Sequence, residues 1–362
     1  MKKRLLSLVI MLSLLGLLMI YSSSYIWAEY KYLDPLKYFK NQFFFFVIGL
    51  ILMIIISKIN VKIYYKKANK LLIFGFSLLI LVLIFGSVRN GSKSWFDLGF
   101  FSLQPSEIMK IILLVFTSKY LANNQDNIKY TFKTITPILT IVLLSFFLIM
   151  LQPDFGSGVV LVMSIIGLLF ISGADFSFFV KIGLLGIVGA IILILIAPYR
   201  MARIVAFLNP WSDPLGSGFQ IIQSLYAIGP GGLFGKGLGN SIQKHFYLPE
   251  PQTDFIFAII CEELGFLGAL LVIILFASII YTMIKIALKT DDLFKKYLAF
   301  GISFQMGFQT IINLLVVIGL IPVTGVTLPF LSYGGSSLLV SMLSIGIILN
   351  IDSSNKDFTN TC

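Results

Sequence analysis

The sequence predicts an all-α polytopic integral membrane protein, and three observations support this fold class. Of its 362 residues, 58% are hydrophobic, only 12% are charged, and the mean hydropathy is +0.97, whereas soluble domains carry about 25% charged residues. Long apolar runs recur along the chain, each of about 17 to 25 residues, which is the length that an α-helix needs to cross a bilayer. Basic residues gather beside one set of the helix ends, as is typical of the cytoplasmic side.

We expect about ten transmembrane helices, one for each apolar run. The runs cover residues 5–25, 41–57, 71–88, 105–121, 135–152, 156–173, 178–198, 254–284, 297–320 and 330–350. An even number places both termini on the same side, and most of the 27 lysines and arginines fall on inner segments if that side is the cytoplasm. The first run is followed by no Ala-x-Ala cleavage site, so we interpret it as a retained span rather than a signal peptide.

The chain is predicted to form a single transmembrane domain over residues 1–362. Its largest extracytoplasmic loop, residues 199–253, lies between the seventh and eighth predicted helices, and loops of that length usually carry function. A second outer segment, residues 89–104, mixes aromatic, charged and glycine residues. The tail, residues 351–362, is expected to be short and disordered.

The same observations exclude several classes of function. A formal charge of +11 can indicate nucleic-acid binding, but these basic residues lie beside helix ends, where they meet anionic membrane lipids. The glycines of the outer loop form no P-loop, because no Gly-Lys-Ser/Thr follows at the required spacing. Cys261 and Cys362 lie too far apart in predicted depth for a disulfide, and no metal-ligand spacing occurs. We therefore expect membrane lipids as partners, no nucleic acid and no organic cofactor.

Asp254 is the candidate catalytic residue, because it lies at the outer end of a long apolar segment. A carboxylate there costs free energy unless something uses it. A structural alternative stays open, since an acidic residue at a helix start can accept hydrogen bonds from free backbone N–H groups. Glu262 and Glu263 lie about 12 to 13 Å deeper along the helix. Glu262 is a candidate for the wall of a substrate cavity, and we expect Glu263 to pair with polar groups of neighbouring helices.

Glu107 and Lys110 are candidates for binding a phosphate group of the substrate. They lie three residues apart and so share one helix face, and a lysine within the outer leaflet needs an anionic partner. The alternative is a capping box, in which Glu107 folds back on a helix start that has Pro105 at its first position.

Four further residues complete the candidate substrate-binding set. Arg89 and Trp95 belong to the outer segment 89–104, and Asp154 lies in a glycine-rich turn between two predicted helices. Ser332 lies in segment 325–337, whose small residues also permit close helix packing. For Asp154 and Ser332, a purely structural role is the alternative.

Five motifs follow one another in a characteristic order along the outer segments. They are Asn90-Gly-Ser-Lys-Ser-Trp, Gln104-Pro-Ser-Glu, Gln152-Pro-Asp-Phe-Gly-Ser-Gly, Leu248-Pro-Glu-Pro-Gln-Thr-Asp-Phe-Ile-Phe and Leu328-Pro-Phe-Leu-Ser-Tyr-Gly-Gly-Ser-Ser. Together they resemble the SEDS family (shape, elongation, division and sporulation), the multi-spanning peptidoglycan glycosyltransferases of bacteria. The segments 213–224 and 322–327 resemble its FtsW/SpoVE branch. RodA is more distant, since its relatives usually have histidine at the position of Gln252.

The resemblance implies that the protein is a lipid II polymerase, an inverting hexosyltransferase that works at the outer face of the cytoplasmic membrane during cell division or sporulation. Asp254 matches the family's essential aspartate and would act as general base on the acceptor hydroxyl. Lys110 or a divalent cation, Mg²⁺ or Mn²⁺, would stabilise the pyrophosphate leaving group. Glu107 and Asp254 are the candidate ligands of that cation.

The resemblance also implies partners and a location. The expected partners are a class B penicillin-binding protein, which is a transpeptidase, and other cell-wall proteins of the divisome or of sporulation. The expected location is the division septum or the forespore. Two alternatives stay open, namely a flippase that moves lipid II across the bilayer and a non-catalytic scaffold for a transpeptidase. The acidic and aromatic segments cluster at the outer face, which favours the enzyme over the flippase.

Overall fold

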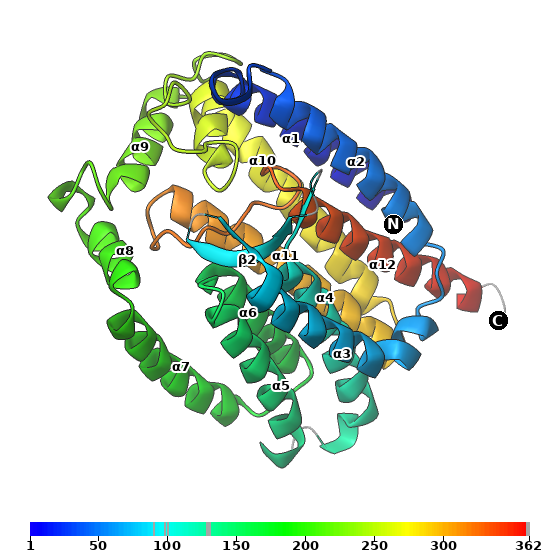
Figure 1. Ribbon diagram of the computed structural model, residues 1–362. Helices are drawn as coiled ribbons and strands as arrows, with labels where there is room; N and C mark the ends of the chain where they lie inside the picture. The colour runs from blue at the N-terminus through cyan, green and yellow to red at the C-terminus, as the bar shows by residue number, and fades with distance from the viewer. Residues whose placement is uncertain (90, 98, 100, 128–131, 360–362) are drawn as a thin grey trace.

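Ten long helices dominate the computed structural model, which describes residues 1–362 except 90, 98, 100, 128–131 and 360–362 (Figure 1). They are α1 (Lys2–Tyr32), α2 (Lys37–Ile56), α3 (Lys62–Phe85), α4 (Pro105–Asn123), α5 (Phe132–Met150), α6 (Phe155–Ile171), α7 (Phe176–Ile196), α10 (Ile256–Leu288), α11 (Leu293–Val317) and α12 (Gly335–Thr359). The shorter helices are α8 (Pro198–Leu208) and α9 (Phe219–Ile228), with single 3-10 turns at η1 (Gln125–Asn127), η2 (Pro210–Ser212) and η3 (Gly229–Gly231).

The helices confirm the predicted all-α membrane protein. Among the described residues, seven helices are long and apolar enough to cross a membrane, namely α1, α2, α3, α7, α10, α11 and α12. Two further apolar stretches, Thr134–Met150 in α5 and Phe155–Ile171 in α6, are shorter. The helix α4 is less apolar because it carries Glu107, Lys110 and Lys119. The crossing of the membrane by α4, α5 and α6, and the cytoplasmic placement of both termini, stay predictions.

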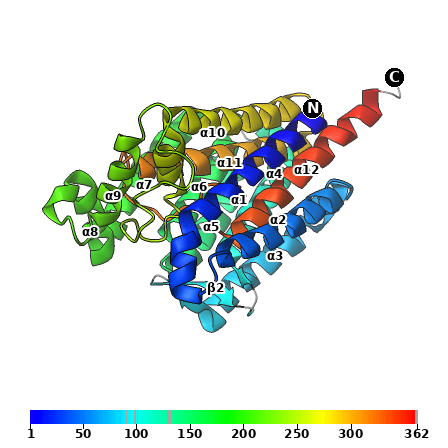
Figure 2. The same cartoon turned by 90° about the horizontal axis from the view of Figure 1, so that it is seen from above.

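The helices α11 and α12 lie at the centre of the bundle. Of their most apolar windows, 61% and 83% of the residues are buried. The helix α12 packs on α2, α11 packs on α10, α6 and α4, and α1 packs on α10 and α2, so that α1, α2 and α12 run side by side (Figure 2). Gly16 permits one close approach, since a Cβ there would lie 2.4 Å from the Phe330 carbonyl oxygen. The helix α1 therefore lies directly against the segment that precedes α12.

The helix α7 lies at the side of the bundle (Figure 1). Of its 21 residues, the structure buries Phe178 alone, although α7 is the most apolar of the candidate spans. A helix that is apolar on all sides requires an apolar environment. The surface of α7 is therefore suited to contact with lipid.

A small antiparallel sheet, which the sequence did not predict, lies in the outer segment before α4. Its strands are β1 (Ser87–Arg89), β2 (Ser92–Asp97) and β3 (Ser102–Leu103), in the order β1-β2-β3, with Ser87 opposite Trp95. Ser94 lies in β2, and its hydroxyl donates to the Gln152 carbonyl oxygen at 3.1 Å. The sheet is thereby fixed to the end of α5.

The C-terminal segment differs from the prediction, because α12 continues to Thr359. Asp352 is buried, its Oδ2 accepts a hydrogen bond from the Lys2 backbone N–H at 2.8 Å, and the Met1 amino group lies 3.5 Å from the same atom. These contacts with the N-terminus stabilise the end of the helix. Residues 351–359 are therefore helical rather than disordered, and 360–362 lie outside the described residues.

Candidate active site

Asp254 lies in the turn that precedes α10 and does not cap that helix. The helix begins at Ile256 with Phe255 in the capping position and no side-chain capping bond, so the structural alternative for Asp254 is wrong. The residue is half-buried. Within the described part of the chain, its carboxylate makes no hydrogen bond or ion pair. The carboxylate oxygens of Asp254 can therefore accept hydrogen bonds from a substrate, whereas those of a capping residue already accept from backbone N–H groups.

The non-helical segment 321–334 forms the opposite side of the Asp254 site. Gly325 has a φ of +73°, and a Cβ built there would lie 3.8 Å from Asp254 Oδ2. The Tyr333 N–H donates to the Gln252 carbonyl oxygen at 2.8 Å. Two irregular stretches that are far apart in the sequence are thereby joined around the carboxylate.

Two amide residues of α11, which the sequence reasoning missed, hold these stretches together. The Asn313 Nδ2 donates to the Asp254 carbonyl oxygen at 2.8 Å and to the Val326 carbonyl oxygen at 2.7 Å. One turn earlier, the Gln309 Nε2 donates to the Thr327 carbonyl oxygen at 3.0 Å. Polar residues spaced four apart inside an apolar helix were the signal that could have pointed to them.

Lys110 and Glu107 form a buried ion pair on α4. The Lys110 Nζ lies 2.8 Å from Glu107 Oε1, and the side chains are 1% and 8% exposed. Lys110 Nζ also donates to Gln309 Oε1 at 3.2 Å. The structure confirms Pro105 at the first helical position but shows no side-chain capping bond there. The alternative of a capping box is therefore wrong, because Glu107 pairs with Lys110 instead.

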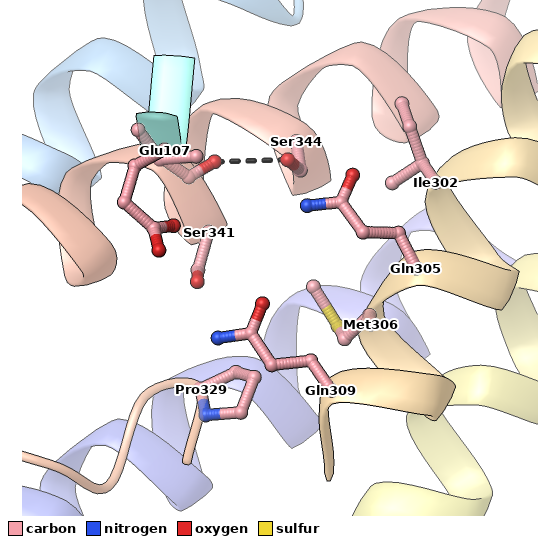
Figure 3. Close-up of a pocket in the computed structure, with 9 residues that line it drawn as sticks. Glu107, Ile302, Gln305, Met306, Gln309, Pro329, Ser341 and Ser344 are labelled. Atoms are coloured by element: carbon pink, nitrogen blue, oxygen red, sulfur yellow. Dashed lines mark hydrogen bonds between the residues drawn. The ribbon is translucent and has the colours of Figure 1, made fainter. Parts of the chain in front are cut away.

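A small cavity of about 10 Å³ lies beside this pair (Figure 3). It is lined by side chains of α4, α11 and α12 and by Pro329, namely Glu107, Ile302, Gln305, Met306, Gln309, Pro329, Val340, Ser341 and Ser344. Roughly 10 to 15 Å³ is the room that one water molecule needs. The Gln305 Oε1 is buried without a partner in the described residues, so a water molecule or a substrate atom has an acceptor there.

Asp154 and Ser332 have structural partners. Asp154 caps α6, where Oδ1 accepts from the Ser157 N–H at 3.2 Å, and its Oδ2 accepts from Gln104 Nε2 at 2.8 Å. Ser332 Oγ accepts from the Leu328 N–H at 2.8 Å. Asp154 therefore joins the starts of α6 and α4, and Ser332 shapes the turn before α12. Binding of substrate by either residue stays a prediction.

Trp95 and Arg89 belong to the small sheet. Trp95 is half-buried in β2, and its carbonyl oxygen accepts from Ser87 Oγ at 3.1 Å. Arg89 ends β1, but its side chain lies outside the described residues. The sheet precedes α4 directly, so Trp95 lies on the segment that leads to the Glu107 and Lys110 pair. A role for both residues in binding substrate stays a prediction.

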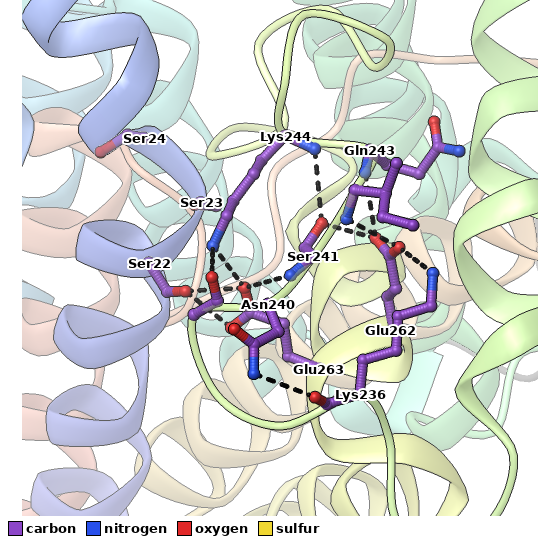
Figure 4. A network of polar contacts seen from close by, with 12 residues as sticks. Ser22, Ser23, Ser24, Lys236, Asn240, Ser241, Gln243, Lys244, Glu262 and Glu263 are labelled. Carbon is purple, nitrogen blue, oxygen red and sulfur yellow. Dashed lines mark hydrogen bonds and ion pairs between the residues drawn. The ribbon is translucent and has the colours of Figure 1, made fainter.

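Glu262 holds the long loop, residues 199–253, and does not join the Asp254 site in a hydrogen-bonded cluster. Its carboxylate is fully buried and accepts from Lys236 Nζ at 2.8 Å, from Ser241 Oγ at 2.5 Å and from the Ile242 N–H at 2.9 Å (Figure 4). The Gln243 N–H adds a fourth bond at 3.3 Å. The four bonds engage both oxygens of the Glu262 carboxylate. They give no support to its predicted role in a cavity wall.

Glu263 makes a second anchor beside the first (Figure 4). Its Oε1 lies 2.9 Å from Lys244 Nζ, and both side chains are fully buried. Ser22 of α1 donates to both carboxylate oxygens, at 2.8 and 2.6 Å, as expected for a residue that pairs with a neighbouring helix. The buried charge pair thus joins the loop to α10, and the Ser22 hydroxyl joins α1 to the same carboxylate.

The helix α10 is broken where this loop meets it. Gly265 has a φ of +66° and a ψ of −163° inside the helix. The freed backbone groups bond to the loop instead, since the Phe266 N–H donates to the Gly232 carbonyl oxygen at 2.8 Å and the Lys236 N–H donates to the Glu262 carbonyl oxygen at 2.9 Å. The break is therefore satisfied by the loop, as a break at membrane depth must be.

The described residues do not fit a divalent cation cage. They contain no group of three or more His, Cys, Asp or Glu side chains that could hold a metal ion. Glu107 is already neutralised by Lys110. Mg²⁺ is usually bound through one or two carboxylates together with substrate phosphates, so any cation at Asp254 would depend on the substrate for most of its ligands.

The chain is similar to proteins of bacterial cell-wall synthesis. It is 51% identical over 344 residues to the stage V sporulation protein E of Bacillus subtilis, covering 94% of each chain. It is 43% identical to a probable peptidoglycan glycosyltransferase FtsW of Coxiella burnetii, covering 93% of this chain and 92% of the relative.

Two solved structures share the fold. A chain from a peptidoglycan synthase complex that coordinates polymerization and crosslinking superposes with a TM-score of 0.80 at 28% identity, with 97% of each chain covered. The rod shape determining protein RodA of Thermus thermophilus gives a TM-score of 0.73 at 27% identity, covering 97% of this chain and 96% of RodA. The model of the FtsW, RodA and SpoVE cell cycle proteins matches residues 3–357. The chain therefore belongs to the FtsW/RodA/SpoVE family of cell cycle proteins.

Proposed function

We propose that this chain is a peptidoglycan glycosyltransferase that polymerises lipid II at the outer face of the bacterial cytoplasmic membrane. The observation that carries the proposal is the Asp254 carboxylate, which is half-buried, does not cap α10 and borders Gly325. Related chains named probable peptidoglycan glycosyltransferases support the same reaction. The similarity of this chain to a stage V sporulation protein and to FtsW supports a location at the septum or the forespore.

The proposed reaction is a displacement at the anomeric carbon of the lipid-linked donor. The acceptor sugar hydroxyl attacks that carbon, the bond to the pyrophosphate oxygen breaks, and the hydroxyl proton passes to Asp254. A positioned general base contributes typically about 10²- to 10⁴-fold to such a step. A single base and one leaving group give inversion at the anomeric carbon.

Lys110 is the proposed partner of the pyrophosphate. Lys110 Nζ lies 2.8 Å from Glu107 Oε1 within the bundle. The Gln309 amide connects Lys110 Nζ with the Thr327 carbonyl oxygen, two residues from Gly325. This connection supports a substrate that lies between Asp254 and the buried pair. A divalent cation stays a prediction, and no step of the proposal depends on it.

Purified protein in detergent micelles tests the proposal. Lipid II supplied as the sole sugar substrate should be converted to glycan strands, which a gel of the products detects. Micelles contain no second compartment, so transport of lipid II cannot produce this result. A well-folded chain that forms no strands, either alone or with its cognate transpeptidase, would contradict the proposed activity and favour the flippase or the scaffold.

Lys110→Met is expected to weaken donor use more than Glu107→Gln does. The methionine leaves the developing pyrophosphate charge without a cation, whereas the glutamine leaves Lys110 in place. We expect at least a tenfold rise in the lipid II concentration at half-maximal rate for Lys110→Met.

Lys119→Met, on the same helix, is the matched control, because Lys119 Nζ donates to Asn69 Oδ1 at 3.4 Å near the surface. Both buried variants should also melt at lower temperature, since each leaves one buried group unpaired. Donor saturation curves that coincide for Lys110→Met and the parent protein would exclude Lys110 from pyrophosphate binding.

The proposed partner is a class B penicillin-binding protein, which would crosslink the strands. The similarity to a chain of a peptidoglycan synthase complex supports a partner of this kind. The outer loop exposes Leu215 by 88% and Phe234 by 77%, whereas residues 236–243 are held by the two buried glutamates. The exposed part of the loop is therefore the proposed contact surface, with stimulation arising from ordering of the site.

Co-purification with the cognate transpeptidase should raise the polymerisation rate, including when the transpeptidase serine is blocked. The variants Leu215→Asp and Phe234→Asp should lose this stimulation while the rate without partner stays unchanged. A partner that neither binds nor raises the rate would contradict the loop contact, and so would full stimulation of both variants.

A further inference from the structure

Asn313 uses both hydrogens of one amide to join two irregular segments. The residue lies on α11 and is 1% exposed. Its Nδ2 donates to the Asp254 carbonyl oxygen at 2.8 Å and to the Val326 carbonyl oxygen at 2.7 Å. An amide nitrogen carries two donors, so these two bonds use its whole capacity. Neither accepting carbonyl belongs to a helix.

The Asp254 backbone lies before α10 and outside the regular hydrogen bonding of that helix. Regular backbone bonding in α10 begins at Ile256. The segment that carries Val326 is likewise non-helical, from Pro322 up to the turn at Pro329. A buried side chain that bonds both backbones helps to set their separation, together with the bond from the Tyr333 N–H to the Gln252 carbonyl oxygen. Asn313 occupies that position.

The separation that Asn313 sets is the one that borders the carboxylate. Val326 follows Gly325, where an added Cβ would lie 3.8 Å from Asp254 Oδ2. One turn away on α11, Gln309 bonds both the Thr327 carbonyl oxygen and Lys110 Nζ. The helix α11 therefore holds the Gly325 segment by two amides, one beside Asp254 and the other beside Lys110.

We propose that Asn313 is a positioning residue for the glycosyl transfer, which holds the Asp254 carboxylate against the Gly325 segment in the orientation that proton transfer requires. This inference rests on the proposed role of Asp254 as general base. Asn313 acts through the Asp254 backbone and does not contact the reacting atoms. A displacement of about 1 Å in a catalytic group can cost about 10²-fold in rate, so loss of this clamp should lower kcat rather than donor binding.

Asn350 provides a matched control within the same chain. It lies on α12, and its Nδ2 donates to the Ser57 carbonyl oxygen at 2.8 Å and to the Ile59 carbonyl oxygen at 2.7 Å. The residue is 8% exposed. Replacing it therefore removes the same two kinds of bond at a place that has no contact with Asp254.

The experiment compares Asn313→Leu with Asn350→Leu in the lipid II polymerisation assay. Both variants keep the side-chain size and lose both donors, so both should melt at lower temperature. We expect Asn313→Leu to lower kcat by about 10- to 100-fold with KM within about twofold of the parent, whereas Asn350→Leu keeps the parental kcat. Equal kcat values for the two variants, or a loss confined to KM, would overturn the positioning role.

Asp254→Asn in the same assay separates this inference from the proposed function. If Asp254→Asn retains the parental kcat, the general-base role fails and the positioning role fails with it. If Asp254→Asn is inactive while Asn313→Leu behaves like Asn350→Leu, the positioning role alone fails. A low kcat in both Asp254→Asn and Asn313→Leu, with a parental kcat in Asn350→Leu, is the result that supports both.

Discussion

Lys244→Met is expected to destabilise the protein by about 3–5 kcal/mol, because it leaves the Glu263 carboxylate buried without its cation. The two charged groups lie 2.9 Å apart, and both side chains are fully buried. Ser22 and Ser241 would remain as donors, but neither carries a charge. The loop should then separate from α10. Thermal unfolding in detergent measures the loss, and limited digestion with chymotrypsin should cut the loop faster than in the parent protein.

Lys40→Met is the matched control for this prediction. Lys40 Nζ lies 2.9 Å from Asp34 Oδ2, but the side chains are 58% and 34% exposed. Exposed pairs contribute about 0–1 kcal/mol, so this variant should melt close to the parent protein and resist chymotrypsin equally well. Equal melting temperatures for Lys244→Met and Lys40→Met would show that the buried pair does not hold the loop.

The fold class and the positions of the long helices could be predicted from the sequence, because apolar length reports directly on membrane crossing. Pro105 at the start of α4 was predictable for a local reason, since proline suits the first helical position. The end of α12 was not, because its last turns depend on contacts of Asp352 with the N-terminus, 350 residues away in the chain. The small sheet was missed because its strands are short and depend on pairing with one another.

The candidate site was predicted in part. A carboxylate beside an apolar run made Asp254 a candidate, and its expected role as general base came from the resemblance to the SEDS family. The helix face shared by Glu107 and Lys110 agrees with their ion pair. The capping box does not form, because the Glu107 carboxylate pairs with the buried Lys110. An unpaired buried lysine would cost more free energy than an uncapped helix start. Asn313 was missed because both of its accepting carbonyls lie outside α11. The spacing of Gln309 and Asn313 marks two polar positions on an apolar helix, but it does not identify the backbone groups that they bond.

The role of Glu262 could not be predicted from its position along the apolar segment alone. A carboxylate within a membrane helix indicates either a functional cavity or a buried structural network. The structure shows the network, formed by Lys236, Ser241 and two backbone N–H groups of the loop. The loop folds back on α10 because Gly265 breaks that helix. The sequence of the loop does not indicate that the loop contacts Glu262.

Asp254→Asn is expected to reduce lipid II polymerisation by about 10²- to 10⁴-fold, the contribution of a general base. The amide has the shape of the carboxylate but cannot accept the acceptor's proton. Folding should be unaffected, because the Asp254 contact with Asn313 uses the backbone carbonyl oxygen rather than the side chain. Asp34→Asn removes the same charge from the connection between α1 and α2, and we expect it to retain the parental rate.

The most direct test is the initial rate of glycan strand formation at saturating lipid II, measured for the purified parent protein, Asp254→Asn and Asp34→Asn in parallel. Melting temperature and lipid II binding are measured on the same samples, so that a misfolded variant is recognised. We expect strand formation by the parent and by Asp34→Asn, with parental lipid II affinity but a rate at least about 100-fold lower for Asp254→Asn. A parental rate in a well-folded Asp254→Asn protein would contradict the role of Asp254 as general base.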